Sequence, residues 1–151
     1  MKILPINTKS KKYKIYIGHN IISSLNKIIK KEKIIFKKIL FVVDNKVPKI
    51  FLKKIKSKIN SEKKLIYLFN ASEKNKSFIS VNSILDILFK NNFTRNDVII
   101  CLGGGIAGDV SGFVASIYKR GTKFINIPST LLSQVDSSIG GKTGVNNKFG
   151  K

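Results

Sequence analysis

The chain has 151 residues, a length typical of one domain, and 42% of them are hydrophobic, which is enough for a packed core. No apolar run reaches the roughly 18 residues of a membrane span, and the N-terminus lacks the apolar centre of a signal peptide. The net charge of +21 comes almost entirely from lysines spread along the chain, which indicates compositional bias and no specific nucleic-acid partner. With a single cysteine, Cys101, we expect a cytoplasmic protein without disulfides and without a membrane partner.

Hydrophobic periodicity predicts the secondary structure in chain order. Alternating apolar residues over 2–7 and 12–17 predict two short strands joined by a polar turn. Mostly apolar runs predict four further strands, at 39–43, 64–69, 97–102 and 123–127. Apolar residues at helical spacing predict four helices, over 21–29, 50–59, 78–88 and 110–117.

The alternation of strands and helices favours a mostly parallel sheet with helices on both faces. We therefore predict a Rossmann-like α/β fold with an N-terminal β-hairpin, in one domain over residues 1–151. Asn20 is a candidate N-cap of the first helix, and Pro48 fits the first turn of the second. Four side chains of that second helix are expected to face inward: Ile50, Phe51, Ile55 and Ile59.

A glycine-rich turn follows the strand predicted at 97–102 and opens the next helix. Gly103, Gly105 and Gly108 have the G-x-G-x-x-G spacing. Glycines let the backbone approach a pyrophosphate closely, and the N-terminus of the helix then faces the anion. A tight strand-to-helix turn without a ligand has the same pattern, so the spacing by itself leaves both interpretations open.

The acidic residues differ from those of an ordinary Rossmann unit. Such a unit has a carboxylate about 20 residues after the glycines, for the ribose hydroxyls, but residues 124–129 contain none. The acidic candidates, Asp44 and Glu73, each follow an earlier predicted strand. A carboxylate at the end of such a strand either binds a ligand or accepts hydrogen bonds that stabilise a turn, and the sequence leaves the two interpretations open.

Three other residues or motifs carry weaker signals. Gly140-Gly141-Lys142-Thr143 resembles the end of a P-loop, but Asp136 stands where that motif requires glycine, which excludes a Walker A site. Cys101 lies in an apolar run and is expected to be a buried thiol without a redox role. The only histidine, His19, is expected at a surface turn.

Taken together, the motifs resemble the 3-dehydroquinate synthase family. Gly103 to Asp109 (GGGIAGD) match its glycine turn, and Tyr118-Lys119-Arg120-Gly121 match its next helix end. The stretch from Pro128 to Thr143 (PSTLLSQVDSSIGGKT) and the stretch from Val145 to Lys151 (VNNKFGK) match two further motifs. Upstream, Glu73-Lys74-Asn75-Lys76 fits the family's G-E-x-x-K loop, with Ser72 in place of the glycine.

The resemblance implies an enzyme, a lyase of the shikimate pathway and hence of aromatic amino acid biosynthesis. The family binds NAD in a Rossmann-like N-terminal domain and converts 3-deoxy-D-arabino-heptulosonate 7-phosphate, a sugar phosphate, to 3-dehydroquinate and phosphate. It also implies a homodimer and a divalent metal, zinc or cobalt, whose ligands lie in a C-terminal helical domain that this chain lacks. The alternatives are another sugar phosphate cyclase, a metal-dependent alcohol or glycerol dehydrogenase, or a non-catalytic NAD-binding remnant.

The resemblance also implies roles for individual residues. The adenosine end of NAD is assigned to Asp44, Ser72, Glu73 and Lys76. The pyrophosphate is assigned to Gly104, Gly105, Ile106, Ala107, Gly108 and Asp109. The nicotinamide side is assigned to Ser129, Thr130 and Leu132, and contacts with cofactor or substrate to Lys142 and Lys151. The catalytic residues on the substrate side are Arg120, as a phosphate ligand, Asp136 and Lys142. No metal ligand is expected in this chain.

Overall fold

The computed structural model describes residues 1–8 and 12–150. Its centre is a four-stranded, fully parallel sheet in the order β4–β3–β5–β6. The strands are β3 (Lys38–Asp44), β4 (Lys63–Phe69), β5 (Val98–Gly103) and β6 (Lys123–Pro128). The four apolar runs of the sequence are thus confirmed as strands, each shifted by no more than one residue at either end.

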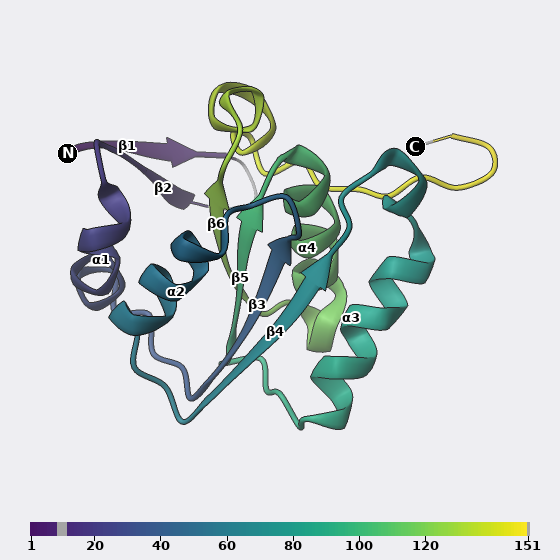
Figure 1. Ribbon diagram of the computed structural model, residues 1–151, viewed down its shortest axis with the longest axis horizontal. Helices are drawn as coiled ribbons and strands as arrows, with labels where there is room; N and C mark the ends of the chain where they lie inside the picture. Colours follow the sequence, from purple (N-terminus) through teal and green to yellow (C-terminus); the bar gives the residue numbers. More distant parts are fainter. Residues whose placement is uncertain (9–11, 151) are drawn as a thin grey trace.

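Helices cover both faces of this sheet, as predicted. On one face lie α1 (Leu25–Lys31) and α2 (Lys49–Lys58), and on the other lie α3 (Phe78–Lys90) and α4 (Gly105–Ile117) (Figure 1). Among the described residues, none of the helices combines the length and apolarity needed to cross a bilayer.

Two apolar cores result, one on each side of the sheet, because side chains along a strand alternate between its faces. In β3, Ile39, Phe41 and Val43 pack towards α1 and α2. Leu40 and Val42 pack towards α3 and α4. All five are almost completely buried, which explains why this strand has an unbroken apolar sequence.

Two local expectations were wrong. Asn20 stands at the N-cap position of a 3-10 turn over Ile21–Ser24, which precedes α1, but it adopts a left-handed conformation (φ 49°) and its side chain makes no capping hydrogen bond. In α2, Ile50 and Phe51 are 64% and 43% exposed. The inward stripe of this helix starts at Leu52 and continues through Ile55 and Ile59, because residues three and four positions apart share one helix face.

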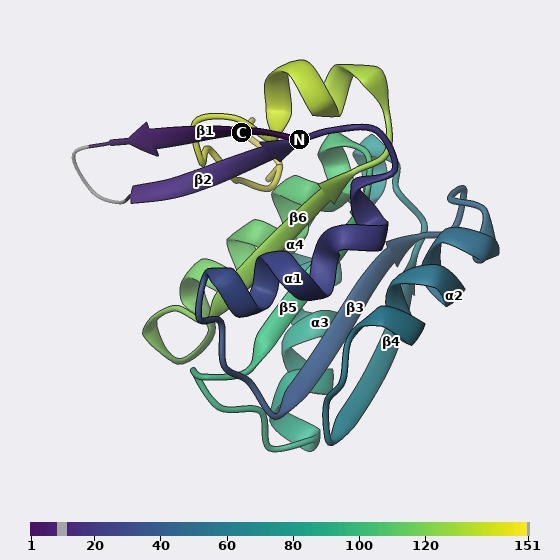
Figure 2. The same ribbon diagram turned by 90° about the vertical axis from the view of Figure 1, so that its left-hand side faces the viewer.

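The predicted hairpin is present and forms a separate two-stranded antiparallel sheet. It consists of β1 (Lys2–Asn7) and β2 (Lys12–Ile17) and projects from one end of the domain (Figure 2). Glu32, just after α1, accepts hydrogen bonds from Lys14 Nζ and Tyr16 Oη. Burial and then the Glu32 contact raise the pKa of Tyr16 to about 12. The same hydrogen bonds, that from Tyr16 first, lower the pKa of Glu32.

A buried carboxylate joins the starts of the two central strands. Asp97, 2% exposed, precedes β5, and its Oδ1 accepts the backbone N–H of Lys38 at 2.8 Å, at the start of β3. Its Oδ2 accepts the backbone N–H and the hydroxyl of Thr94 at 2.7 and 3.0 Å. Burial alone would raise the pKa of Asp97, but the hydrogen bonds together outweigh burial and lower it.

We therefore predict an acid-sensitive contribution from Asp97. Since its pKa is lower in the folded chain, this stabilisation is complete above the unfolded pKa of about 4 and is lost as pH falls through the folded value. Asp97→Asn should lower the free energy of unfolding at pH 7 by about 1–3 kcal/mol and flatten its decline below about pH 5. Urea titrations at several pH values measure both effects. Asp86→Asn, at an exposed position of α3, is the control; equal behaviour of the two variants would contradict the prediction.

Candidate functional site

The candidate site lies at the edge of the sheet where the parallel strands end. The chain runs outward from β3 to β4, and then returns to place β5 on the other side of β3. Ligands bind open α/β sheets at such a reversal of strand order, outside the carboxyl ends of the strands. The two strand ends that flank the reversal carry Asp44 and Gly103. The sequence predicts a ligand-binding role for both positions, Asp44 as an acidic candidate and Gly103 as the start of the glycine turn.

The glycine turn is closely packed against its surroundings. A Cβ added at Gly103 would lie 2.7 Å from Cβ of Ala107 and 3.0 Å from Cβ of Asp44. At Gly105 it would lie 2.8 Å from Oγ of Ser137. Because the first intrahelical hydrogen bond of α4 runs from Gly108 N to the Gly104 carbonyl, the preceding N–H groups have no intrahelical acceptor. This N-terminus therefore offers N–H donors without an acceptor in the helix, beside glycines that carry no side chain of their own, which fits a pyrophosphate.

An ion pair lies beside this turn. The ammonium of Lys76 contacts Oδ2 of Asp109, in the second turn of α4, and their side chains are only 11% and 19% exposed. Lys76 ends a short 3-10 turn, η2 (Glu73–Asn75), which begins with a hydrogen bond from Asn75 N to the hydroxyl of Ser72 at 3.3 Å. The fold thus brings together a residue predicted for the adenosine end of NAD and one predicted for its pyrophosphate.

The residues predicted for the nicotinamide side follow β6. Ser129 N donates to the Gly103 carbonyl at 2.8 Å, which continues the contact between the two strands beyond their ends. Thr130 and the buried Ser133 form a closed turn, in which the Thr130 hydroxyl donates to Oγ of Ser133 at 2.9 Å and accepts the Ser133 N–H at 3.2 Å. Leu132 is 71% exposed. Ser129 and Thr130 thus lie next to the glycine turn.

The structure brings together only some of the residues predicted for the substrate side. Asp136 lies exposed in a single π turn, η4 (Ser133–Ser137), and Lys142 lies exposed in the following segment. Both follow the turn that starts at Ser129. Lys151 lies outside the described residues, so its predicted role stays a prediction.

Arg120 lies elsewhere. It ends the 3-10 turn η3 (Tyr118–Arg120) after α4, next to the start of β6. Because α4 is about 20 Å long, Arg120 and the glycine turn are at opposite ends of the helix. There it lines an open hollow, together with Arg95, Asn96, Gly121, Thr122 and Lys123. Within one chain, the structure does not bring Arg120 together with Asp136 and Lys142.

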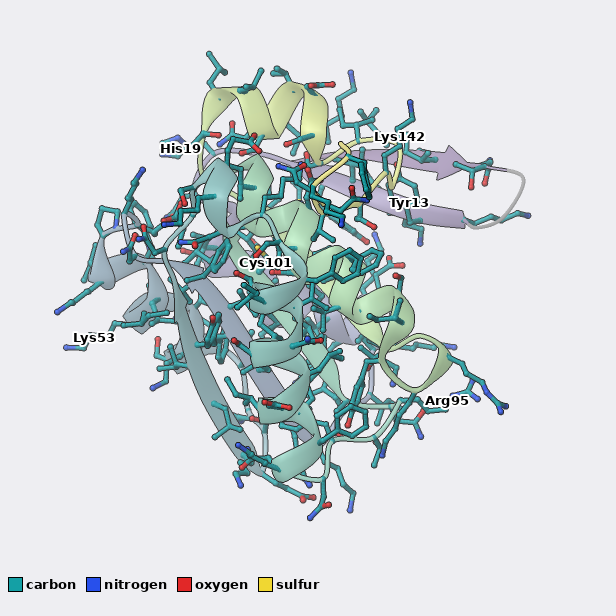
Figure 3. All side chains as sticks on the ribbon, turned by 90° about the vertical axis from the view of Figure 1, so that its right-hand side faces the viewer. Tyr13, His19, Lys53, Arg95, Cys101 and Lys142 are labelled. Atoms are coloured by element: carbon teal, nitrogen blue, oxygen red, sulfur yellow. The ribbon has the colours of Figure 1, made fainter. Side chains whose placement is uncertain are left out.

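The two residues given non-catalytic roles are found as expected. Cys101 is fully buried in β5, and burial raises its pKa to about 12. His19 is exposed at a turn (Figure 3). Among the described residues, no three His, Cys, Asp or Glu side chains lie close enough together to hold a metal ion.

Comparison with known families gives a decisive match. The family described as 3-dehydroquinate synthase N-terminal matches residues 66–151, which contain the glycine turn and every later motif. The chain belongs to this family. The 3-dehydroquinate synthase of Pelagibacter ubique is 55% identical over 98% of this chain, and that of Ruthia magnifica is 42% identical over all of it. The chain spans 40% and 42% of the lengths of these two relatives.

Solved structures agree on the fold. A 2-deoxy-scyllo-inosose synthase matches 99% of the chain and 42% of its own length with a TM-score of 0.89, at 23% identity. A 2-epi-5-epi-valiolone synthase from Streptomyces hygroscopicus, solved with NAD+ and Zn2+ bound, is 29% identical over 74% of this chain and 32% of its own, with a TM-score of 0.64. The Rossmann-like fold expected from the sequence is therefore confirmed.

Some residues that shape the site were not singled out from the sequence. Ser133 closes the turn after β6, and Ser137 of the same segment lies against the glycine turn. Tyr13 contacts the segment around Lys142 at Gly140, and Asn146 joins the end of that segment to the loop of Lys76. A hydroxyl three residues after Thr130 is a recognisable turn signal. Tyr13, by contrast, comes from the hairpin, 127 positions from its partner, and no local pattern reveals such a contact.

We predict that the ion pair between Lys76 and Asp109 stabilises this end of the domain. Asp109→Asn leaves a largely buried ammonium without its counter-charge, so the free energy of unfolding should fall by about 1–3 kcal/mol. In a double-mutant cycle, Lys76→Met combined with Asp109→Asn should cost less than the sum of the single changes. Urea denaturation measures all three variants.

The exposed pair between Lys37 and Glu62, 3.5 Å apart, provides the matched control. Glu62→Gln should change the free energy of unfolding by no more than about 0.5 kcal/mol. Strict additivity in the cycle, or equal losses for Asp109→Asn and Glu62→Gln, would show that the buried pair contributes nothing.

Proposed function

We propose that residues 1–151 form the NAD-binding portion of a 3-dehydroquinate synthase that works in the cytoplasm. The observation that carries the proposal is the convergence of predicted cofactor residues at one edge of the sheet. Asp44 ends β3, the loop 72–76 follows β4, the glycine turn follows β5, and Ser129–Thr130 follow β6. NAD serves in such an enzyme by accepting a hydride from a substrate alcohol and later returning it.

The residues of the site fit the parts of this cofactor. We assign the pyrophosphate to the free N–H groups at the start of α4, where the helix dipole favours an anion. Asp44, 7% exposed at the end of β3, fits the ribose hydroxyls, with Glu73 and Lys76 on the same side. Ser129 and Thr130, on the far side of the glycine turn, are assigned to the nicotinamide end. The 2-epi-5-epi-valiolone synthase with NAD+ bound supports this assignment, because it is 29% identical over 74% of this chain.

The proposed substrate is 3-deoxy-D-arabino-heptulosonate 7-phosphate, with Asp136 and Lys142 as the residues on its side. Lys142 is an ammonium suited to the negative charge of a sugar phosphate. The described residues contain no cluster of three side chains able to hold the divalent metal that the family implies. The family relationship favours a synthase over the dehydrogenases that share the fold.

We further propose that the protein acts as a homodimer. Arg120 is predicted to bind the substrate phosphate, but it lies at the end of α4 remote from the glycine turn. It could therefore reach such a site only from another copy of the chain. Arg120 has the guanidinium geometry suited to bidentate phosphate contact.

The first test is NAD binding by the 151-residue chain, which we expect to be weak but measurable by titration calorimetry. Gly105→Val should abolish it, because a side chain at this position would collide with Ser137, 2.8 Å away, and enter the anion site. Gly18→Val is the control, since Gly18 is not among the residues assigned to NAD and a Cβ there would meet only Met1, no nearer than 3.4 Å. Unchanged binding by Gly105→Val would remove the glycine turn from the site.

The second test is catalysis. We predict that residues 1–151 by themselves release no phosphate from the heptulosonate phosphate, because Asp136 and Lys142 are exposed to water and the described chain does not enclose a substrate beside them. A phosphate-release assay checks this, with the synthase of Pelagibacter ubique as the positive control. Sustained turnover by the purified chain would contradict the prediction.

A further inference from the structure

The segment that carries Lys142 has an unusual course. We call residues 140–146 the strap; it runs from the turn η4 across α4 to the loop that contains Lys76 (Figure 1). Gly140 and Gly141 have φ angles of 92° and 69°, and a Cβ added at either would meet nothing within 4 Å. At these two glycines the course of the backbone is therefore not set by packing, and it depends on contacts made elsewhere along the strap.

The first contact is at the beginning of the strap. Gly140 N donates a hydrogen bond to the hydroxyl of Tyr13 at 2.7 Å. Tyr13 belongs to β2 of the N-terminal hairpin, and Figure 3 shows its side chain on the same side of the molecule as Lys142. The hairpin, which otherwise stands apart from the main sheet, thus supports the strap two residues before Lys142.

The strap then crosses α4 at a glycine. A Cβ added at Gly112 would lie 2.5 Å from Cγ2 of Thr143, so the absence of a side chain there leaves the space that the strap occupies. Val145, two residues later, is 7% exposed and packs in the core between the sheet and α4.

The last contact is a set of hydrogen bonds to the loop after β4. Asn146 N donates to the Lys76 carbonyl at 2.7 Å, and Asn146 Nδ2 donates to Oε2 of Glu73 at 2.9 Å. Asn146 also forms a parallel β-bridge with Ser77. The end of the strap is therefore held by the loop that carries Ser72, Glu73 and Lys76, three of the residues assigned to the adenosine end of NAD.

We propose that Tyr13 and Asn146 are positioning residues, which hold Lys142 at the cofactor site by fixing the two ends of the strap. Through Asn146, the strap and the loop of Glu73 and Lys76 form one unit. Loosening either end therefore displaces Lys142, and loosening the Asn146 end also displaces the adenosine side. This inference rests on the proposed function, because Glu73 and Lys76 are assigned to the cofactor there and Lys142 to the substrate beside it.

The experiment uses the ¹⁵N-labelled 151-residue chain and two variants, Asn146→Ala and Tyr13→Phe. Asn146→Ala removes the hydrogen bond to Glu73, which costs stability. It also removes Oδ1, which is buried without a partner among the described residues, and losing this unpaired atom offsets the cost, so global stability should change little. Asn147→Ala is its control, because Asn147 Oδ1 accepts only within the next turn, from Phe149 N at 2.7 Å. Tyr67→Phe, on β4, is the control for Tyr13→Phe.

We expect amide exchange to become about tenfold faster at position 146 in Asn146→Ala and at Gly140 in Tyr13→Phe, with melting temperatures within about 2 °C of the parent. The NAD dissociation constant from shift titration should rise about fivefold to tenfold in Asn146→Ala and remain unchanged in both controls. A change that acted only on global stability would move the melting temperature and leave the dissociation constant unchanged.

Two outcomes would overturn the inference. One is unchanged amide exchange at positions 140 and 146 in the variants. The other is faster exchange with an NAD affinity equal to that of the Asn147→Ala control. If the parent chain does not bind NAD at all, the proposed function fails, whereas the exchange rates still decide whether these two residues hold the strap.

Discussion

The contact between Gly103 and its two neighbours governs the arrangement of the site. Gly103 packs so closely against Ala107 on α4 and Asp44 on β3 that no side chain fits between them. A Cβ added at Gly103 would lie 2.7 Å from the Cβ of Ala107 and 3.0 Å from that of Asp44. This closeness lets α4 begin directly at the end of β5, at the point where strand order reverses. The free N–H groups of the helix and the carboxylate of Asp44 consequently lie at the same edge of the sheet.

Charge at this edge is organised, although the chain as a whole is strongly basic. The chain has 29 lysines and arginines but only eight acidic residues, so most of the basic side chains have no acidic residue to pair with. Asp109 is nevertheless committed to Lys76, and Glu73 to Asn146. These pairings connect three segments that are distant in sequence, namely the loop after β4, the start of α4 and the strap. They add polar contacts around the glycine turn to the apolar packing of Ala107 and Val145.

The elements of the fold were predictable because they depend on local patterns. An apolar run such as 39–43 becomes a strand covered on both sides, and its period and length are visible in the sequence. Local detail was less predictable. Ile50 and Phe51 are as apolar as Ile55, but they lie exposed because the helix presents only one face to the sheet. Asn20 is a residue type that often caps helices, yet its side chain makes no capping hydrogen bond to the 3-10 turn that follows it. Its Oδ1 accepts a hydrogen bond from Lys54 Nζ instead.

The sequence by itself determined the alternation of strands and helices, the glycine turn and the family to which the chain belongs, since motif order and hydrophobic period are properties of neighbouring residues. Tertiary structure alone decided which of the predicted site residues meet. It placed Asp44, Lys76, Asp109 and Thr130 around one turn, and it placed Arg120 at the far end of α4. It also revealed the contacts of Tyr13 and Asn146 that support the segment carrying Lys142. Such contacts join positions many residues apart, and only the packing of helices and strands in space brings them within hydrogen-bonding distance.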